Sequence, residues 1–184
     1  MNNIDEYLNE NTINKYCEAL SKELQEAGFG EHRMLIVGGA AMVLKFRDGR
    51  STIDIDICLR EQNHLYECCM KVAEKFDLPE DWINADVMHS DSFSYALFDN
   101  AVKYKKYNDL LDVYVASDID LYCMKLVSFR PKDIQDMQVL SEKLNADGVT
   151  RKDIEKNFLR LYGDAYLMKN ELNKIRLFEM QFKQ

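Results

Sequence analysis

Two aspartates, Asp54 and Asp56, stand two residues apart within the segment STIDIDICL, residues 51–59. Isoleucines alternate with them, and this period of two predicts a β-strand. Both carboxylates then lie on the same side of the strand, where they repel each other unless a cation lies between them. Mg²⁺ and Mn²⁺ prefer such hard oxygen ligands and bridge nucleotide phosphates. The pair therefore predicts a metal site.

Two glycines, Gly38 and Gly39, follow the apolar run of residues 34–37 and precede a short predicted helix over residues 40–46. Glycines after a strand let the backbone approach a ligand closely, and a helix N-terminus offers N–H groups to a phosphate. A plain strand-to-helix turn would explain the glycines by themselves. A dinucleotide-binding loop would need the pattern GxGxxG, which VGGAAM lacks. The aspartate pair downstream favours a phosphate site.

The segment IVGGAAMVLKFRDGRSTIDIDI, residues 36–57, resembles the signature of the nucleotidyltransferase superfamily. That signature combines Gly-Gly or Gly-Ser at a helix start with Asp-x-Asp on the next strand. The chain is more closely similar to small bacterial nucleotidyltransferase-like proteins of toxin–antitoxin and abortive-infection systems. The later residues Lys125 to Asp136 and the stretch 81–84 add to this similarity, which covers about residues 34–140.

This resemblance implies transfer of a nucleoside monophosphate from a nucleoside triphosphate to a hydroxyl acceptor. Asp54 and Asp56 would hold two Mg²⁺ (or Mn²⁺) ions, and Gly38 and Gly39 would cradle the β- and γ-phosphates. A tRNA end, a protein side chain and a small molecule all stay open as the acceptor. A cognate toxin or antitoxin is a further expected partner. The alternative is a catalytically silent nucleotidyltransferase-like module that acts by binding or as an antitoxin.

Further nucleotide contacts are expected from Arg50, Lys125, Arg130, Asp133 and Asp136. Lys125 would support the triphosphate and join the catalytic residues, and the alternative is an exposed helix lysine. Asp133 and Asp136 lie three apart on a predicted helix and so share a face. Their alternative is a surface role near a helix start.

A third carboxylate commonly completes such sites, and Asp112 is the catalytic and metal-binding candidate. It lies on the polar face of the predicted strand LLDVYVA, residues 110–116. The helix pair Asp133 and Asp136 is the other candidate. If neither serves, the silent module becomes the better interpretation.

The surrounding pattern predicts an α/β (α+β) fold with a nucleotidyltransferase-type mixed β-sheet flanked by helices and a helical C-terminal region. We expect one domain over residues 1–184, with a core over about 30–140 and a helical cap over about 141–184. The expected helices cover 3–27, 40–46, 62–76, 117–129, 131–144, 150–162 and 164 to near the end. The expected strands cover 34–37, 51–59, 93–98, 102–107 and 110–116.

The composition restricts the class of protein. A net charge of −8 argues against a general basic surface for nucleic acid. The five cysteines include no CxxC pair, so we expect reduced thiols in a cytoplasmic protein rather than a disulfide framework or a zinc site. The acidic N-terminus is not that of a signal peptide, and no apolar run has the length of a membrane span.

Overall fold

The computed structural model describes residues 7–46, 49–60 and 64–163. It divides into two compact units. Unit 1 comprises Met1–Met88 and Ala101–Val115, and unit 2 comprises His89–Asn100 and Ala116–Gln184. Each unit is described by itself below.

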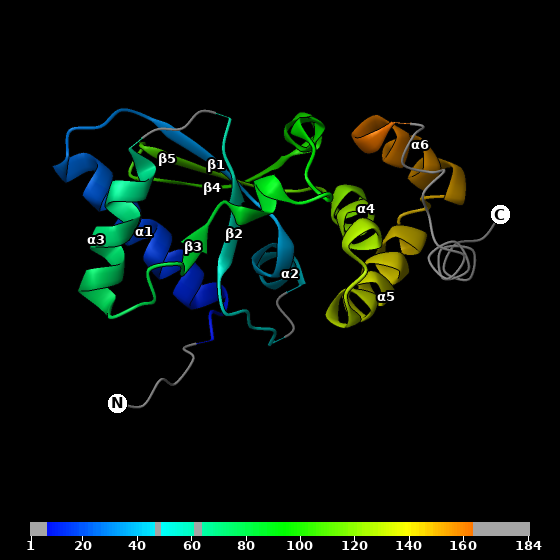
Figure 1. Ribbon diagram of the computed structural model, residues 1–184, viewed down its shortest axis with the longest axis horizontal. Helices are drawn as coiled ribbons and strands as arrows, with labels where there is room; N and C mark the ends of the chain where they lie inside the picture. The colour runs from blue at the N-terminus through cyan, green and yellow to red at the C-terminus, as the bar shows by residue number, and fades with distance from the viewer. Residues whose placement is uncertain (1–6, 47–48, 61–63, 164–184) are drawn as a thin grey trace. The chain divides into compact units, whose positions relative to one another are not determined.

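Unit 1 is built on one five-stranded mixed sheet (Figure 1) with the strand order β3-β2-β1-β5-β4. The central strand β1 runs parallel to β5 and antiparallel to β2. The edge strand β3 runs parallel to β2, and β4 at the opposite edge runs antiparallel to β5. The strands cover His32–Ile36 (β1), Ile55–Cys58 (β2), Ile83–Asn84 (β3), Val102–Tyr107 (β4) and Leu111–Val115 (β5).

The strand that carries the aspartates is shorter than the sequence predicts. β2 begins at Ile55, whereas the alternating pattern predicts a strand from residue 51. Ile55 and Ile57 are buried, but Ile53 is 59% exposed. Thr52 instead forms an isolated bridge with Leu8. Because the chain pairs with that N-terminal residue before it enters the sheet, Asp54 lies just ahead of β2 and Asp56 lies within it.

In the described part of unit 1, the α-helices are α1 (Glu10–Glu26), α2 (Gly38–Phe46) and α3 (Leu65–Phe76). α1 begins later than predicted because Asn9 and Thr12 form a capping box. α1 packs against α3, and α2 lies next to β2 (Figure 1). The tight turn from β1 into α2 passes through Val37, whose amide donates to Asp56 O at 3.0 Å.

Unit 2 is helical in the part of it that the structure describes. The 3₁₀ helix η2 covers Tyr95–Asn100, and α4, α5 and α6 cover Asp118–Ser128, Pro131–Ala146 and Arg151–Tyr162. Ser117 and Thr150 are the N-caps of α4 and α6, since each side-chain hydroxyl accepts from the backbone amide three residues later. Both α5 and α6 pack against α4. The predicted mixed α/β fold with a helical C-terminal region is confirmed.

Two predicted elements differ from the structure, and a third is not described. Residues 93–98 form no strand: Leu97 alone is buried there, and the Ser94 hydroxyl accepts from Ala96 N, which favours the 3₁₀ turn of η2. Residues 83–84, which lie in none of the predicted helices or strands, form the edge strand β3. The predicted last helix from residue 164 lies outside the described residues.

All five cysteines are buried with free thiols. Burial raises the pKa of Cys17, Cys58, Cys69 and Cys123 to about 12 and also raises that of Cys68. In the ranges that the structure describes, no helix combines the length and apolar character needed to span a membrane.

Candidate active site

The aspartate pair and the glycine pair come together in unit 1, as their spacing predicts. Gly38 is the first residue of α2 and has a φ of +62°, in the left-handed region that favours glycine. A Cβ atom at this position would overlap Asp56 Oδ2 and lie 3.2 Å from Asp56 Cγ. The Asp56 carboxylate therefore lies directly against the backbone at the start of α2. Any side chain at position 38 would displace it.

The backbone at Gly39 lies equally close to the Thr52 side chain. A Cβ atom there would lie 2.7 Å from Thr52 Oγ1. The same hydroxyl lies 3.5 Å from Asp54 Oδ1, within donating distance. The two glycines thus bring the N-terminal end of α2 against the segment that carries both aspartates.

Asn84 is a further member of this site that the sequence analysis did not include. It pairs with Asp56 across β2 and β3, and its Nδ2 lies 3.4 Å from Asp54 Oδ2 as a donor. Its Oδ1 accepts from Asp86 N at 3.1 Å, which fixes the orientation of the amide. The only sequence signal was the resemblance of the stretch 81–84, because a two-residue strand has no periodicity to detect.

We expect Gly38→Ala to lower the free energy of unfolding by about 2–3 kcal/mol, because the new Cβ adds an overlap with Asp56 to the left-handed strain. Gly28→Ala is the matched control in the same unit, since Gly28 has a φ of +71° and no atom within 4 Å of an added Cβ. It should cost only about 1–2 kcal/mol. Urea unfolding measures both.

A double-mutant cycle with Asp56→Ala tests the cause of this difference. Removing the Asp56 carboxylate should relieve part of the cost of Gly38→Ala, giving a coupling of about 1 kcal/mol. Strictly additive effects would show that the contact between Gly38 and Asp56 has no energetic consequence.

Asp112 does not lie beside the aspartate pair. Asp112 is in register with Arg33 on β1, whereas Asp56 is level with Val37, four residues further along that strand. At a rise of about 3.3 Å per residue, this register offsets the backbone positions of the two aspartates by about 13 Å along the strand direction. Nearest the pair, β5 presents the apolar Val115, which is in register with Ile36. The predicted third carboxylate is thus not brought to the first two.

The Asp112 carboxylate instead has cationic partners. It is 5% exposed, and Lys103 Nζ lies 2.7 Å from Oδ1 and Arg33 Nε 3.9 Å from Oδ2.

The predicted phosphate contact Arg50 lies after α2, with its guanidinium 5.8 Å from the centre of the Phe46 ring.

The donor set at the aspartate pair fits a cation that arrives with a nucleotide. Among the described residues, no three His, Cys, Asp or Glu side chains gather into a potential metal-binding group. Mg²⁺ is commonly held by one or two carboxylates, with substrate phosphates and water completing its octahedron. Asp54 and Asp56 supply two such carboxylates, next to the helix N-terminus at Gly38.

Unit 2 brings together the other predicted nucleotide-binding residues. Lys125 on α4 is 4% exposed, and its Nζ lies 3.2 Å from Asp133 Oδ1 and 2.5 Å from Asp136 Oδ2 on α5. Asp133 is fully buried and also accepts from Arg130 Nε at 2.8 Å and Ser128 Oγ at 2.7 Å. Lys125 is therefore not an exposed helix lysine, and Asp133 is not a surface residue.

Residues 4–182 match a family model described as a nucleotidyltransferase of unknown function (DUF6036). The chain belongs to this family. The predicted membership of the nucleotidyltransferase superfamily is thereby confirmed, and the site at Gly38, Asp54 and Asp56 lies well inside the matched range. No curated protein and no solved structure matches the chain.

Lys125, Arg130, Asp133 and Asp136 form a cluster of ion pairs in unit 2. In this nucleotidyltransferase family member, the cluster makes the stability of unit 2 sensitive to acid. Burial alone would raise the pKa of the Asp133 carboxyl. Hydrogen bonds from Arg130 and Ser128 act in the opposite direction and, together with the charge of Lys125, lower the pKa to about 2. A carboxyl whose pKa is lower in the folded state stabilises the fold above its unfolded pKa.

We therefore expect Asp133 to contribute about 2 kcal/mol to stability near neutral pH, and this contribution to vanish as the pH falls from about 4 to about 2. Urea unfolding of wild type and Asp133→Asn across this range measures it. The difference between the two proteins should shrink toward the acid end. A difference that stays constant with pH would contradict the assignment.

Proposed function

We propose that the chain is a metal-dependent nucleotidyltransferase that moves a nucleoside monophosphate from a nucleoside triphosphate to a hydroxyl acceptor. The observation that carries the proposal is the close contact of the Asp56 carboxylate with Gly38 at the N-terminal end of α2. This contact brings an anion-binding helix end and a cation-binding carboxylate pair to one place. Family membership independently supports nucleotidyl transfer.

Each part of the site has a role in this reaction. The first amides of α2 would bind phosphate oxygens, since the N–H groups of a helix start have no partner within the helix. Asp54 and Asp56 would hold the divalent cation, Mg²⁺ or Mn²⁺. When bound, such a cation supplies Lewis-acid stabilisation of charge on phosphate oxygens and on the acceptor hydroxyl. Thr52 and Asn84 would keep Asp54 oriented toward it.

The transfer forms one bond and breaks another. The acceptor oxygen attacks the α-phosphorus in line, the bond from the α-phosphorus to the β-bridging oxygen breaks, and pyrophosphate leaves. The acceptor hydroxyl loses its proton to water. The nucleotide contacts of Arg50, Lys125, Arg130, Asp133 and Asp136 stay predictions, and so does a catalytic role for Lys125.

A catalytically silent binding module, such as an antitoxin, is the second candidate function. The register of Asp112 favours it, because the backbone position of the third carboxylate expected of active relatives is offset from Asp56 by about 13 Å along the strands. Both candidates fit a role in a toxin–antitoxin or phage-defence system, and the buried free thiols fit the reducing cytoplasm.

The test is to incubate the protein with each labelled nucleoside triphosphate and Mg²⁺, with and without total tRNA and cell lysate. Asp54→Ala/Asp56→Ala is the matched variant. Label transferred by wild type and lost in the variant would establish the reaction and identify the nucleotide and the acceptor class. Absence of transfer together with absence of Mg²⁺-dependent nucleotide binding would overturn the proposal in favour of the silent module.

A further inference from the structure

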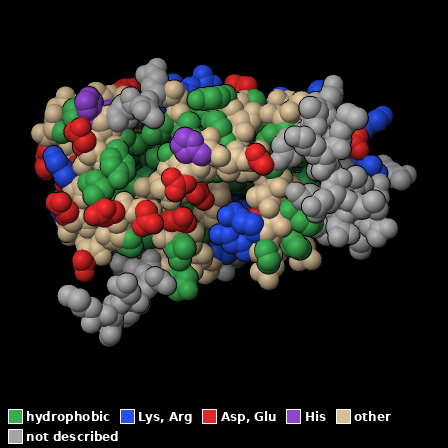
Figure 2. All heavy atoms as spheres, viewed as in Figure 1, with side chains coloured by type: hydrophobic (Ala, Val, Ile, Leu, Met, Phe, Trp, Pro, Cys, Tyr) green, Lys and Arg blue, Asp and Glu red, His purple; other side chains and the backbone are tan. Residues whose placement is uncertain are grey.

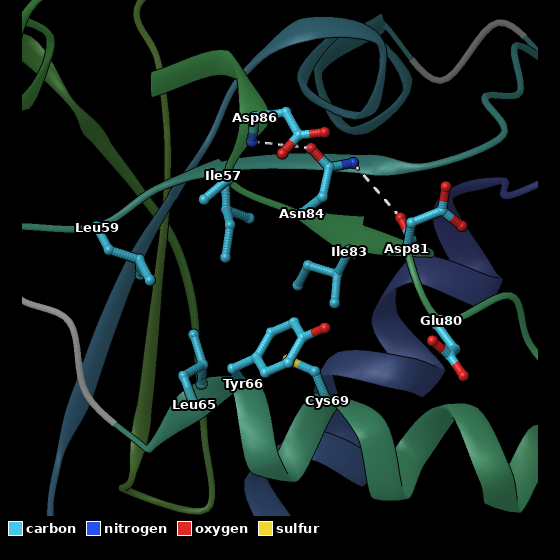
Figure 3. Close-up of a pocket in the computed structure, with 11 residues that line it drawn as sticks. Ile57, Leu59, Leu65, Tyr66, Cys69, Glu80, Asp81, Ile83, Asn84 and Asp86 are labelled. Atoms are coloured by element: carbon cyan, nitrogen blue, oxygen red, sulfur yellow. Dashed lines mark hydrogen bonds between the residues drawn. The ribbon is translucent and has the colours of Figure 1, made fainter. Parts of the chain in front are cut away.

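Asn84 lies on the same face of the sheet as the aspartate pair. It is in register with Asp56 across β2 and β3, and residues in register on neighbouring strands point to the same side of a sheet. Figure 3 shows Ile57 and Ile83 pointing toward α3, whereas Asn84 points away from that helix. Asn84, Asp54 and Asp56 are all half-buried. The amide therefore belongs to the aspartate side of the sheet.

The hydrogen bonds of Asn84 require an amide. Its Oδ1 accepts from Asp86 N at 3.1 Å, so the amino group Nδ2 points the other way. Nδ2 carries two hydrogens and has two acceptors within reach, Asp54 Oδ2 and Asp81 O, each at 3.4 Å. A carboxylate at this position would place an acceptor against both of these oxygens. An aspartate would therefore fit the space at position 84 but not its partners.

Asp54 is held by neutral donors. Asn84 donates to its Oδ2, and the Thr52 hydroxyl lies 3.5 Å from its Oδ1 as a donor. Such donors fix the direction of a carboxylate but bring no charge of their own. Among the residues that the structure describes, no third carboxylate gathers with the pair. The site thus has the two carboxylates of Asp54 and Asp56, with an amide beside them on the neighbouring strand.

The number of carboxylates sets how strongly a site attracts a divalent cation before substrate arrives. Mg²⁺ held by one or two carboxylates takes its other ligands from substrate phosphates and water. Figure 2 shows further Asp and Glu side chains over α3 and β3, and Glu80, Asp81 and Asp86 are exposed there. Exposed carboxylates are screened by water and salt. An added carboxylate would therefore act most strongly at the half-buried position 84.

We propose that Asn84 is a positioning residue that makes cation binding depend on the nucleotide. Its amide directs Asp54 toward the cation site and, because it is neutral, leaves the site too weakly charged to retain Mg²⁺ or Mn²⁺ alone. The triphosphate supplies the missing ligands, so cation and nucleotide bind together. This inference rests on the proposed function for its nucleotide, whereas the effect of Asn84 on the affinity for the cation alone does not.

Asn84→Asp tests this role because it adds the third carboxylate. Binding of Mn²⁺ alone to the full chain is measured by the loss of the free Mn²⁺ signal in electron paramagnetic resonance. We expect a dissociation constant of about 1 mM or weaker for wild type and one at least about tenfold tighter for Asn84→Asp. Gln25→Glu adds the same charge at an exposed position on α1 and should bind Mn²⁺ as wild type does.

The unfolding temperature gives a second readout that a purely structural role would not produce. Without metal, Asn84→Asp should unfold at a lower temperature than wild type, because its carboxylate faces Asp54 Oδ2 and Asp81 O with no hydrogen to donate. Mn²⁺ alone should raise the unfolding temperature of Asn84→Asp and leave that of wild type nearly unchanged.

Asn84→Ala removes the amide without adding charge. It should not respond to Mn²⁺ alone. The probe for joint binding is Mn²⁺ with the α,β-methylene analogue of each of the four common nucleoside triphosphates. Asn84→Ala should need about tenfold more of the effective complex than wild type for the same rise in unfolding temperature, because Asp54 has lost one of its orienting donors.

The outcomes separate this inference from the proposed function. A wild-type dissociation constant of about 0.1 mM or tighter for Mn²⁺ alone would overturn the inference, and so would a folded Asn84→Asp that gains no affinity for Mn²⁺. If Asn84→Asp does not fold even with Mn²⁺, wild-type joint binding by Asn84→Ala overturns it. Failure of the proposed function looks different: no analogue with Mn²⁺ stabilises wild type, while Asn84→Asp still gains affinity for Mn²⁺ alone.

Discussion

Asp56→Asn is expected to abolish Mg²⁺-dependent nucleotide binding and to reduce nucleotidyl transfer by about 1,000-fold or more. An amide of the same shape keeps the contact with Gly38 but removes one of the two negative charges that would hold the cation. The loss of about 4 kcal/mol of charge stabilisation in the transition state corresponds to this factor.

The binding part of this prediction needs no knowledge of the acceptor. A nucleoside triphosphate with Mg²⁺ should raise the unfolding temperature of wild type, because a ligand that binds only the folded state stabilises it by mass action. The same addition should leave Asp56→Asn unchanged. Glu74→Gln, an exposed charge removal on α3, is the control and should behave as wild type. Transfer by Asp56→Asn within about tenfold of wild type would contradict the site assignment.

Asp133→Ala is expected to lower the stability of unit 2 by about 3–4 kcal/mol. The substitution removes a fully buried carboxylate and leaves Lys125, which is 4% exposed, with the carboxylate of Asp136 beside it. A buried ammonium group that loses one of its carboxylate partners lowers the free energy of unfolding. Hydrogen exchange of the α4 and α5 amides measures the effect within unit 2 itself.

Two further variants distinguish the buried charge from a general effect of substitution. Asp147→Ala removes an exposed carboxylate that pairs with Lys143 at 2.9 Å on the surface, and it should cost less than about 1 kcal/mol. Adding Lys125→Met to Asp133→Ala should restore part of the loss, because the buried ammonium that has lost one of its two carboxylate partners is removed. If Asp133→Ala and Asp147→Ala cost the same, the cluster is not a stabilising core of unit 2.

The sequence predicted those parts of the site that depend on neighbours along the chain. The relation of Gly38 to Asp56 is such a case, because a strand, a glycine turn, a short helix and a second strand follow each other within about twenty residues. The caps Ser117 and Thr150 are equally local, since each bonds to an amide three residues later. Local contacts of this kind can be predicted from residue type and spacing alone.

The remainder depends on contacts between distant segments. The alternation around Asp112 predicts its strand, but the offset between β5 and β1 is set by packing, and it places Asp112 level with Arg33. Asn84 enters the site only because a two-residue strand pairs with β2. Lys125 and Asp133 look like helix surface residues until α4 and α5 pack together and bury them.

The buried cysteines make local unfolding of the protein measurable by thiol alkylation. Burial raises the pKa of the Cys123 thiol to about 12 and keeps the side chain away from reagents, so alkylation of the closed protein is slow. Each opening exposes the thiol to water and restores its ordinary reactivity. Cys123 is the one cysteine of unit 2, and the other four belong to unit 1. The mass and position of each alkyl adduct therefore record how often each unit opens in native buffer.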